Sequence, residues 1–141
     1  MRFSAGPRPR WLLPVALLAG AFGVTTIVSG GRVLFGSDAT RAAAGHVVPF
    51  VLWFNFLAGF AYVGDAVGIA SARRWSGMVA AGIAAATALV FLAFGLHVLA
   101  GGAFETRTVA AMTLRTSVWT AIAVAVCRRL GCWLRPGGGK Q

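Results

Sequence analysis

Charged side chains are scarce in this chain of 141 residues. Only 11% of the residues are Asp, Glu, Lys or Arg, whereas a water-soluble domain has about 25%. Hydrophobic residues make up 58% of the chain, and the mean hydropathy is +0.79. This composition leaves no room for a soluble domain and predicts a protein that lies mostly within lipid.

Sequence motifs that would identify a reaction are also missing. The chain contains no nucleophile–base pair, phosphate-binding loop or metal-binding pattern that its spacing makes recognisable. Any chemistry would have to lie among the apolar segments or in the connectors between them. The sequence therefore favours a non-catalytic protein over an enzyme.

Four long apolar stretches fill most of the chain, and they lie at 11–30, 47–70, 78–100 and 109–126. A bilayer core about 30 Å thick needs about 20 apolar residues at about 1.5 Å rise per residue. The first three stretches meet that length, and the fourth is shorter and contains Arg115. We predict an all-α integral membrane protein whose four transmembrane helices pack as an antiparallel up-down bundle.

The connectors between these stretches are short, so residues 1–141 are predicted to form a single four-helix transmembrane domain with short tails. Glycine readily takes the left-handed conformation found at helix C-termini. Gly30 and Gly31 are therefore predicted to end the first helix, and 31–45 to form the longest loop. Gly64 and Gly68 form a Gly-xxx-Gly pair, which predicts a close helix contact in lipid.

The basic residues are distributed unevenly between the two sides of the predicted bundle. Nine cations fall on one side if the chain crosses four times: Arg2, Arg8, Arg10, Arg73, Arg74, Arg128, Arg129, Arg135 and Lys140. The other side has Arg32, Arg41 and Arg107. This asymmetry predicts a multi-pass protein of the cell inner (plasma) membrane with both termini in the cytoplasm. The net charge of +10 then reflects anchors for anionic headgroups, not nucleic-acid binding.

Two cysteines, Cys127 and Cys132, occur in the sequence Cys-Arg-Arg-Leu-Gly-Cys after the fourth apolar stretch. The spacing is neither Cys-x-x-Cys nor a zinc-binding pattern. The predicted compartment is reducing. We therefore expect two unpaired thiols at a helix end.

Polar residues within the apolar stretches are the first functional candidates, because their insertion into lipid costs free energy. Asn55 and Asp65 share one broad stripe of the second helix. Arg115 lies in the fourth, where an arginine at the centre costs about 2.5–3.5 kcal/mol. Arg115 must either snorkel outward or find a partner, and Asn55 matches its depth. Asp65 and Arg115 are the buried-charge candidates, although a direct pair would have to reach across the midplane.

A second polar group is predicted at the outer membrane surface, where His46, His97, Glu105 and Arg107 lie at similar depth. Imidazole rings can bind a metal or haem iron, and a carboxylate can complete a metal shell. His46, His97 and Glu105 are therefore metal-ligand candidates. The alternative is that both histidines are interfacial and bond to loop carbonyls or water.

The same residues also predict a polar pocket that opens outward. Its candidate lining residues are Asn55, His97, Glu105, Arg107 and Arg115. Such a pocket would bind a small polar or anionic headgroup, a quinone carbonyl or a partner subunit. The alternative is that Glu105 and Arg107 only cap the fourth helix.

In size, number of helices and outward polar cluster, the chain is similar to DoxX-like small bacterial inner-membrane proteins. The likeness is architectural, and no diagnostic motif carries it, so no residue role is transferred. It implies a link to quinone-dependent redox systems. Small multidrug transporters also have four short helices, but they rely on an acid in the first helix, and 11–30 contains none.

Three functions remain open at this point. The first is a small inner-membrane protein that acts as a non-catalytic accessory subunit or binds a small ligand or quinone at its outer face. The second is a small transporter or ion-conducting oligomer in which Asp65 and Arg115 move charge. The third is a bis-histidine haem or metal-dependent redox protein that uses His46 and His97. The predicted partners are the lipid bilayer and either further copies of the chain or a larger membrane complex.

Overall fold

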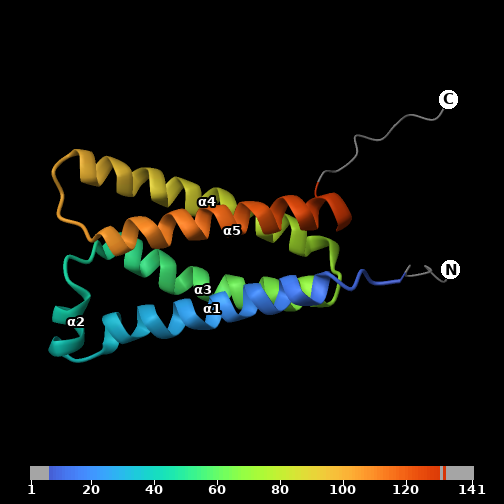
Figure 1. Ribbon diagram of the computed structural model, residues 1–141, viewed down its shortest axis with the longest axis horizontal. Helices are drawn as coiled ribbons and strands as arrows, with labels where there is room; N and C mark the ends of the chain where they lie inside the picture. Colours follow the sequence, from blue (N-terminus) through green and yellow to red (C-terminus); the bar gives the residue numbers. More distant parts are fainter. Residues whose placement is uncertain (1–6, 131, 133–141) are drawn as a thin grey trace.

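The computed structural model describes residues 7–130 and Cys132, and this part of the chain is helical without strands (Figure 1). The helices are α1 (Leu12–Phe35), α2 (Asp38–Ala44), α3 (Pro49–Ala70), α4 (Arg74–Leu99) and α5 (Thr106–Leu130). All except α2 are long and apolar enough to cross a membrane. The all-helical class and the four candidate spans are therefore confirmed. The predictions for Arg2, Arg135 and Lys140 lie outside the described residues.

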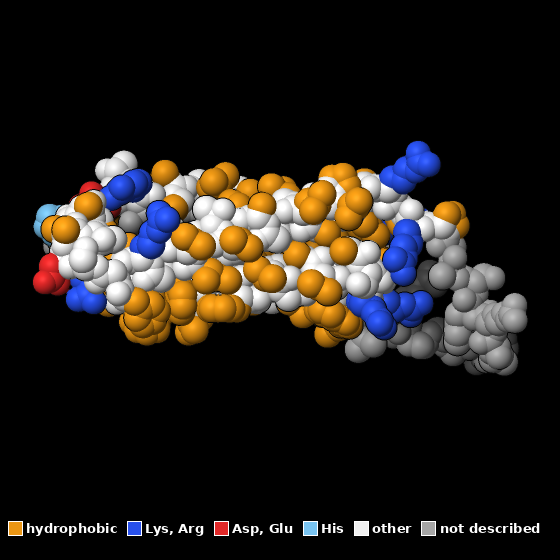
Figure 2. Space-filling view, turned by 90° about the horizontal axis from the view of Figure 1, so that it is seen from below, with side chains coloured by type: hydrophobic (Ala, Val, Ile, Leu, Met, Phe, Trp, Pro, Cys, Tyr) orange, Lys and Arg blue, Asp and Glu red, His pale blue; other side chains and the backbone are white. Residues whose placement is uncertain are grey.

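The four long helices lie side by side along the long axis of the molecule (Figure 1). At one end are α2 and the α4–α5 connector; we call this the α2 end. At the other are the start of α1, the α3–α4 turn and the end of α5; we call this the terminal end. Figure 2 shows hydrophobic side chains along the middle of one face and charged side chains at both ends. Packing is closest between α1 and α3 and between α4 and α5.

The first helix differs from the prediction because it continues past Gly30 and Gly31 to Phe35. Gly30 is buried, and a Cβ atom built on it would lie 3.2 Å from the Cβ of Phe56 in α3. Its lack of a side chain therefore permits close packing of two helices and does not end α1.

Part of the segment predicted as a loop forms the short helix α2. Ser37 provides its N-cap, since the backbone N–H of Thr40 donates to the Ser37 hydroxyl at 3.3 Å. Asp38 stands in the first turn, where a negative charge is favourable. This Ser-Asp sequence is a usual helix start, and it is the signal that a loop assignment overlooked.

The predicted glycine pair contacts another helix at only one of its two positions, since a Cβ atom on Gly68 would lie 3.0 Å from the Cβ of Ser76 in α4. A Cβ atom on Gly64 would meet nothing within 4 Å, whereas one on Gly23 in α1 would lie 2.8 Å from the carbonyl oxygen of Gly59 in α3. Glycine at both positions therefore allows the backbones of α1 and α3 to approach closely. Within this chain, Gly64 faces away from the other helices.

The buried core consists of two clusters. The larger one occupies the middle and terminal end, where the rings of Tyr62 and Trp119 stack with centroids 4.6 Å apart. The smaller one lies toward the α2 end and is formed by Val48, Val51, Phe94 and Met112.

The expectation of two unpaired thiols is wrong, because Cys127 and Cys132 form a disulfide. Their Cα atoms are 4.7 Å apart, which is within the range that a disulfide can bridge. Gly77 in α4 leaves the room for it, since a Cβ atom there would lie 2.6 Å from the Sγ of Cys132. The spacing matched no known motif, so this local packing was not accessible from sequence.

Candidate binding site

Arg115 is the central residue of the candidate site. It lies nine residues after the start of α5, which is about 14 Å along the helix. Its Nη2 atom donates a hydrogen bond to the hydroxyl of Thr26 in α1 at 3.3 Å. Thr26 is 3% exposed and stands nine residues before the end of α1, at the matching depth. Arg115 therefore reaches sideways to a partner helix and does not snorkel outward.

A hollow of about 470 Å³ surrounds this arginine toward the α2 end. We call it the arginine hollow, because three arginines line it. Its lining residues come from α1, α2, α3 and α5: Thr26, Ser29, Gly30, Arg32, Val33, Thr40, Ala43, Ala44, Leu52, Asn55, Arg107, Thr108, Ala111 and Arg115. They include three guanidinium groups, four hydroxyls and one amide, but no carboxylate.

Asn55 and Arg115, which the sequence places at one depth, both line this hollow. The Asn55 amide nitrogen contacts the sulfur of Met112 at 3.7 Å. The amide oxygen of Asn55 and the Nε of Arg115 are buried and have no hydrogen-bond partner among the described residues. A buried polar atom without a hydrogen-bond partner destabilises the folded protein, and a ligand that supplies the partner removes this cost.

Arg107 fixes the α2 end of the hollow. Its Nη2 atom donates to the carbonyl oxygens of Ala44 at 3.2 Å and Ala43 at 3.5 Å, at the C-terminus of α2. A cation is favourable there because the helix dipole ends on unpaired carbonyls. Arg41 donates to the carbonyl of Leu34 in α1 at 3.2 Å. These bonds tie the short helix α2 to both α1 and α5.

Glu105 links the two connectors of the α2 end. Its Oε1 atom accepts the backbone N–H of His46 at 2.9 Å and lies 3.3 Å from the ring Nδ1. Gly45, with φ +75°, leaves the space that this carboxylate occupies. The backbone bond from His46, then its ring, lower the pKa of Glu105. The link is therefore kept at neutral pH and is lost only as the pH falls through this lowered value.

His97 lies apart from Glu105, in the last turn of α4. Its Nε2 atom lies 3.3 Å from the carbonyl oxygen of Ala103, and its ring meets Phe50 edge-on at 6.3 Å. The predicted pocket is thus brought together only in part. Asn55, Arg107 and Arg115 line the arginine hollow, whereas His97 and Glu105 do not.

The metal-ligand candidates are likewise divided. His46 and Glu105 are in contact, but His97 bonds elsewhere. Over residues 7–130 and Cys132, no three His, Cys, Asp or Glu side chains are grouped so that they could hold a metal ion. Haem or metal binding by these residues therefore stays a prediction.

The predicted pocket omitted five polar residues that line the arginine hollow: Thr26, Ser29, Arg32, Thr40 and Thr108. Arg32 was counted only as an outer cation, because the first helix was ended before it. Thr26 and Ser29 were not recognised, since hydroxyls inside an apolar stretch carry a weak signal. The depth match with Arg115 is the signal that could have found Thr26.

Asp65 lies apart from this site. It is 1% exposed, and neither carboxylate oxygen has a hydrogen-bond partner among the described residues. Within the described part of the chain, the only acidic and basic side chains in contact are Glu105 and His46, so Asp65 and Arg115 are not bonded. The hydroxyl of Tyr62, one turn away on α3, is also buried and has no hydrogen-bond partner in the described part of the chain.

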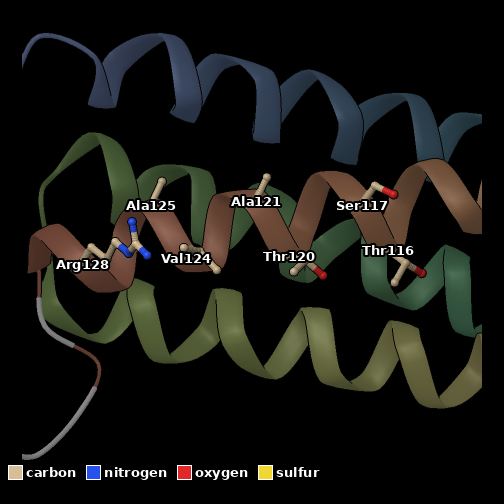
Figure 3. Close-up of a pocket in the computed structure, with 7 residues that line it drawn as sticks. All are labelled: Thr116, Ser117, Thr120, Ala121, Val124, Ala125 and Arg128. Carbon is tan, nitrogen blue, oxygen red and sulfur yellow. The ribbon is translucent and has the colours of Figure 1, made fainter.

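A larger hollow of about 680 Å³ runs along α5 (Figure 3). Its seven lining residues all belong to this one helix: Thr116, Ser117, Thr120, Ala121, Val124, Ala125 and Arg128. Figure 3 shows them along the face of α5 that lies between α1 and α4. A ligand there would be contacted by a single helix, so the arginine hollow, with four contributing helices, is the better candidate.

Comparison of the chain with protein-family models, with curated proteins and with solved structures finds no match. The likeness to DoxX-like proteins stays a prediction for this reason.

Proposed function

We propose that the chain is a non-catalytic inner-membrane protein that binds a small ligand with an anionic group in the arginine hollow. One observation carries the proposal. Arg32, Arg107 and Arg115 converge on one hollow whose lining contains no carboxylate. The protein thus supplies several positive charges and leaves the negative partner to come from outside.

The electrostatics favour an anion over a neutral quinone carbonyl. Two unit charges 4 Å apart attract by about 4 kcal/mol at an effective dielectric constant of about 20. Hydrogen bonds to an ionised group are about twice as strong as those between neutral groups. A quinone carbonyl would accept a hydrogen bond from the unpartnered Nε of Arg115 but would leave the charges uncompensated.

The positive-inside asymmetry, nine cations against three, supports an outward orientation of the hollow. Arg32 and Arg107 belong to the minority on the outer side, where translocated arginines are disfavoured, and this supports a role for them in binding. The Cys127–Cys132 disulfide favours the opposite orientation, with the end of α5 outside the cell, because disulfides are rare in the cytosol. Tag-accessibility mapping of both termini decides: external termini would place the arginine hollow at the cytoplasmic face.

Binding of inorganic phosphate to purified protein in neutral detergent tests the proposal. We expect saturable binding by calorimetry that weakens as salt is added. Arg115→Gln should weaken it about tenfold or more, because a hydrogen bond to a charged group contributes about 1.5–3 kcal/mol. Arg128→Gln is the matched control, since Arg128 is on the same helix but lines the other hollow. Equal affinities for both variants would refute the proposal.

A small transporter or ion-conducting oligomer is the second candidate, and one observation favours it. Asp65 holds a carboxyl group within the span without any partner among the described residues, and intramembrane acids commonly mark ion or proton routes. Asp65→Asn in reconstituted vesicles should then abolish proton-coupled flux. Unchanged flux would remove Asp65 as a coupling residue.

A further inference from the structure

A second depression continues from the arginine hollow toward the middle of the molecule. We call it the α1–α5 groove. It has a volume of about 330 Å³ and is lined by Leu18, Ala21, Phe22, Thr25, Thr26, Ser29, Ala111, Leu114 and Arg115. Thr26, Ser29, Ala111 and Arg115 also line the arginine hollow. The two form one continuous surface that is cationic at the α2 end and apolar farther along.

The groove exists because α1 and α5 are not packed directly against each other. α1 packs on α3, and α5 packs on α4. Where α1 and α5 face each other, the small residues Ala21 and Ala111 leave space, while Leu18 and Leu114 are 51% and 55% exposed. The groove is therefore open sideways, in the direction from which a lipid would enter.

The length of the groove suits a chain-like ligand. Its lining residues on α1 run from Leu18 to Ser29, which is about 16 Å along the helix. An apolar chain could lie along this distance within the membrane core, about 15 Å thick on each side of the midplane. Burial of its methylene groups would contribute favourably at about 0.8 kcal/mol for each CH₂ fully buried.

We propose that the ligand is a phospholipid with a net negative headgroup. Its phosphate would lie among Arg32, Arg107 and Arg115, and one acyl chain would lie in the α1–α5 groove. This inference rests on the proposed function and names the ligand class. Guanidinium groups suit phosphate oxygens, to which they donate two parallel hydrogen bonds. The hydroxyl of Thr26 accepts from Arg115 and therefore keeps its own proton to donate to an ester oxygen between headgroup and chain.

A water-soluble anion fits this surface less well. Thr40, Ala43 and Ala44 of α2 form the wall of the arginine hollow at the α2 end. Bonds from Arg107 hold α2 in that place. Helix α2 thus lies at the end of the hollow, whereas the α1–α5 groove is open sideways toward the bilayer. A soluble anion would also leave the apolar wall without a contact.

The test compares lipid retention by purified protein, measured by native mass spectrometry after exchange into mixed micelles. The lipids are phosphatidylglycerol, which has a net negative charge, and phosphatidylcholine, which has none. We expect about tenfold preference for phosphatidylglycerol, and Arg115→Gln should remove it. Equal retention of the two lipids by the unmodified protein would overturn the proposal.

A groove-filling pair of variants separates the lipid from a soluble anion. Ala21→Phe fills the α1–α5 groove, and Ala121→Phe places the same ring in the α5 hollow; both positions are exposed. We expect Ala21→Phe to reduce phosphatidylglycerol retention at least fivefold without changing the affinity for inorganic phosphate. Ala121→Phe should change neither.

The outcomes distinguish the two proposals. If Ala21→Phe retains phosphatidylglycerol as the unmodified protein does, while Arg115→Gln still loses phosphate, the arginine hollow binds a soluble anion and only the lipid inference fails. If Arg115→Gln alters neither phosphate binding nor lipid retention, the proposed function itself fails.

Discussion

The two halves of the bundle each contain a charged side chain within the span, but Arg115 toward the α2 end faces an open hollow and Asp65 toward the terminal end is enclosed. Toward the α2 end, Arg115 bonds to one hydroxyl and faces an open hollow. In the other half, Asp65 is 1% exposed and has no hydrogen-bond partner among the described residues. Both residues are costly in lipid, but only the arginine can be reached from outside.

This difference teaches that depth in the membrane does not by itself mark a binding site. An intramembrane charge becomes a site when an opening lets a ligand approach it. Tyr62 and Trp119 close the half that contains Asp65, with their rings 4.6 Å apart. At the α2 end no aromatic pair of this kind closes the space in front of Arg115.

Loss of the Tyr62–Trp119 contact should have the largest effect on stability. Trp119 is fully buried, and Trp119→Ala should lower the free energy of unfolding by about 3–5 kcal/mol, because it leaves a large cavity beside Tyr62. Unfolding by sodium dodecyl sulfate in mixed micelles, followed by circular dichroism, measures the change. The variant would also open the terminal half and so make the two halves more alike.

Trp53→Ala is the control for this prediction. Trp53 is already 46% exposed, so its removal should cost less than half as much as that of Trp119. Equal losses would mean that the Tyr62–Trp119 pair has no special part in closing the core, and the contrast between the two halves would be lost.

Asp65→Val should have an intermediate effect, of opposite sign. A buried polar group without a partner costs about 1–3 kcal/mol, so its replacement by an apolar side chain should raise the free energy of unfolding by a similar amount. The same detergent titration measures it.

Arg115→Met should instead change stability by about 1 kcal/mol or less, since one hydrogen bond to Thr26 is lost. A loss of stability in Asp65→Val would show that Asp65 has a structural partner.

The sequence was sufficient for the broad fold, because long apolar runs leave few alternatives in lipid. All four stretches form long helices, although the ends differ by several residues. The predicted end of α1 at Gly30 was wrong because Gly30 packs against Phe56 of another helix. Such a contact depends on the tertiary structure and is not visible in the local sequence. The short α2 was missed because seven residues give too little periodicity for assignment.

The candidate site could be predicted only in part, for a related reason. Asn55, Arg107 and Arg115 stand out because they are polar residues in or near apolar stretches. Whether Arg115 would face α1, α3 or the surface depends on how the helices rotate about their axes. For α1 the rotation is set by packing against α3 at residues such as Gly23 and Gly59, and for α5 it is set by the burial of Met112 and Trp119. The lining by Thr26 and Arg32 follows from it.

The smallest effect should come from the two turns that end α3 and α4. Both have the same hydrogen-bond pattern, from Arg73 to Gly68 and from Gly102 to His97. The residue before each donor has a positive φ, 52° at Ala72 and 85° at Gly101. Ala72→Gly should therefore raise the unfolding free energy by about 0.5–1 kcal/mol, and Gly101→Ala should lower it by about 1 kcal/mol. Thermal unfolding in one detergent compares them, and shifts of the same sign would contradict the strain at Ala72.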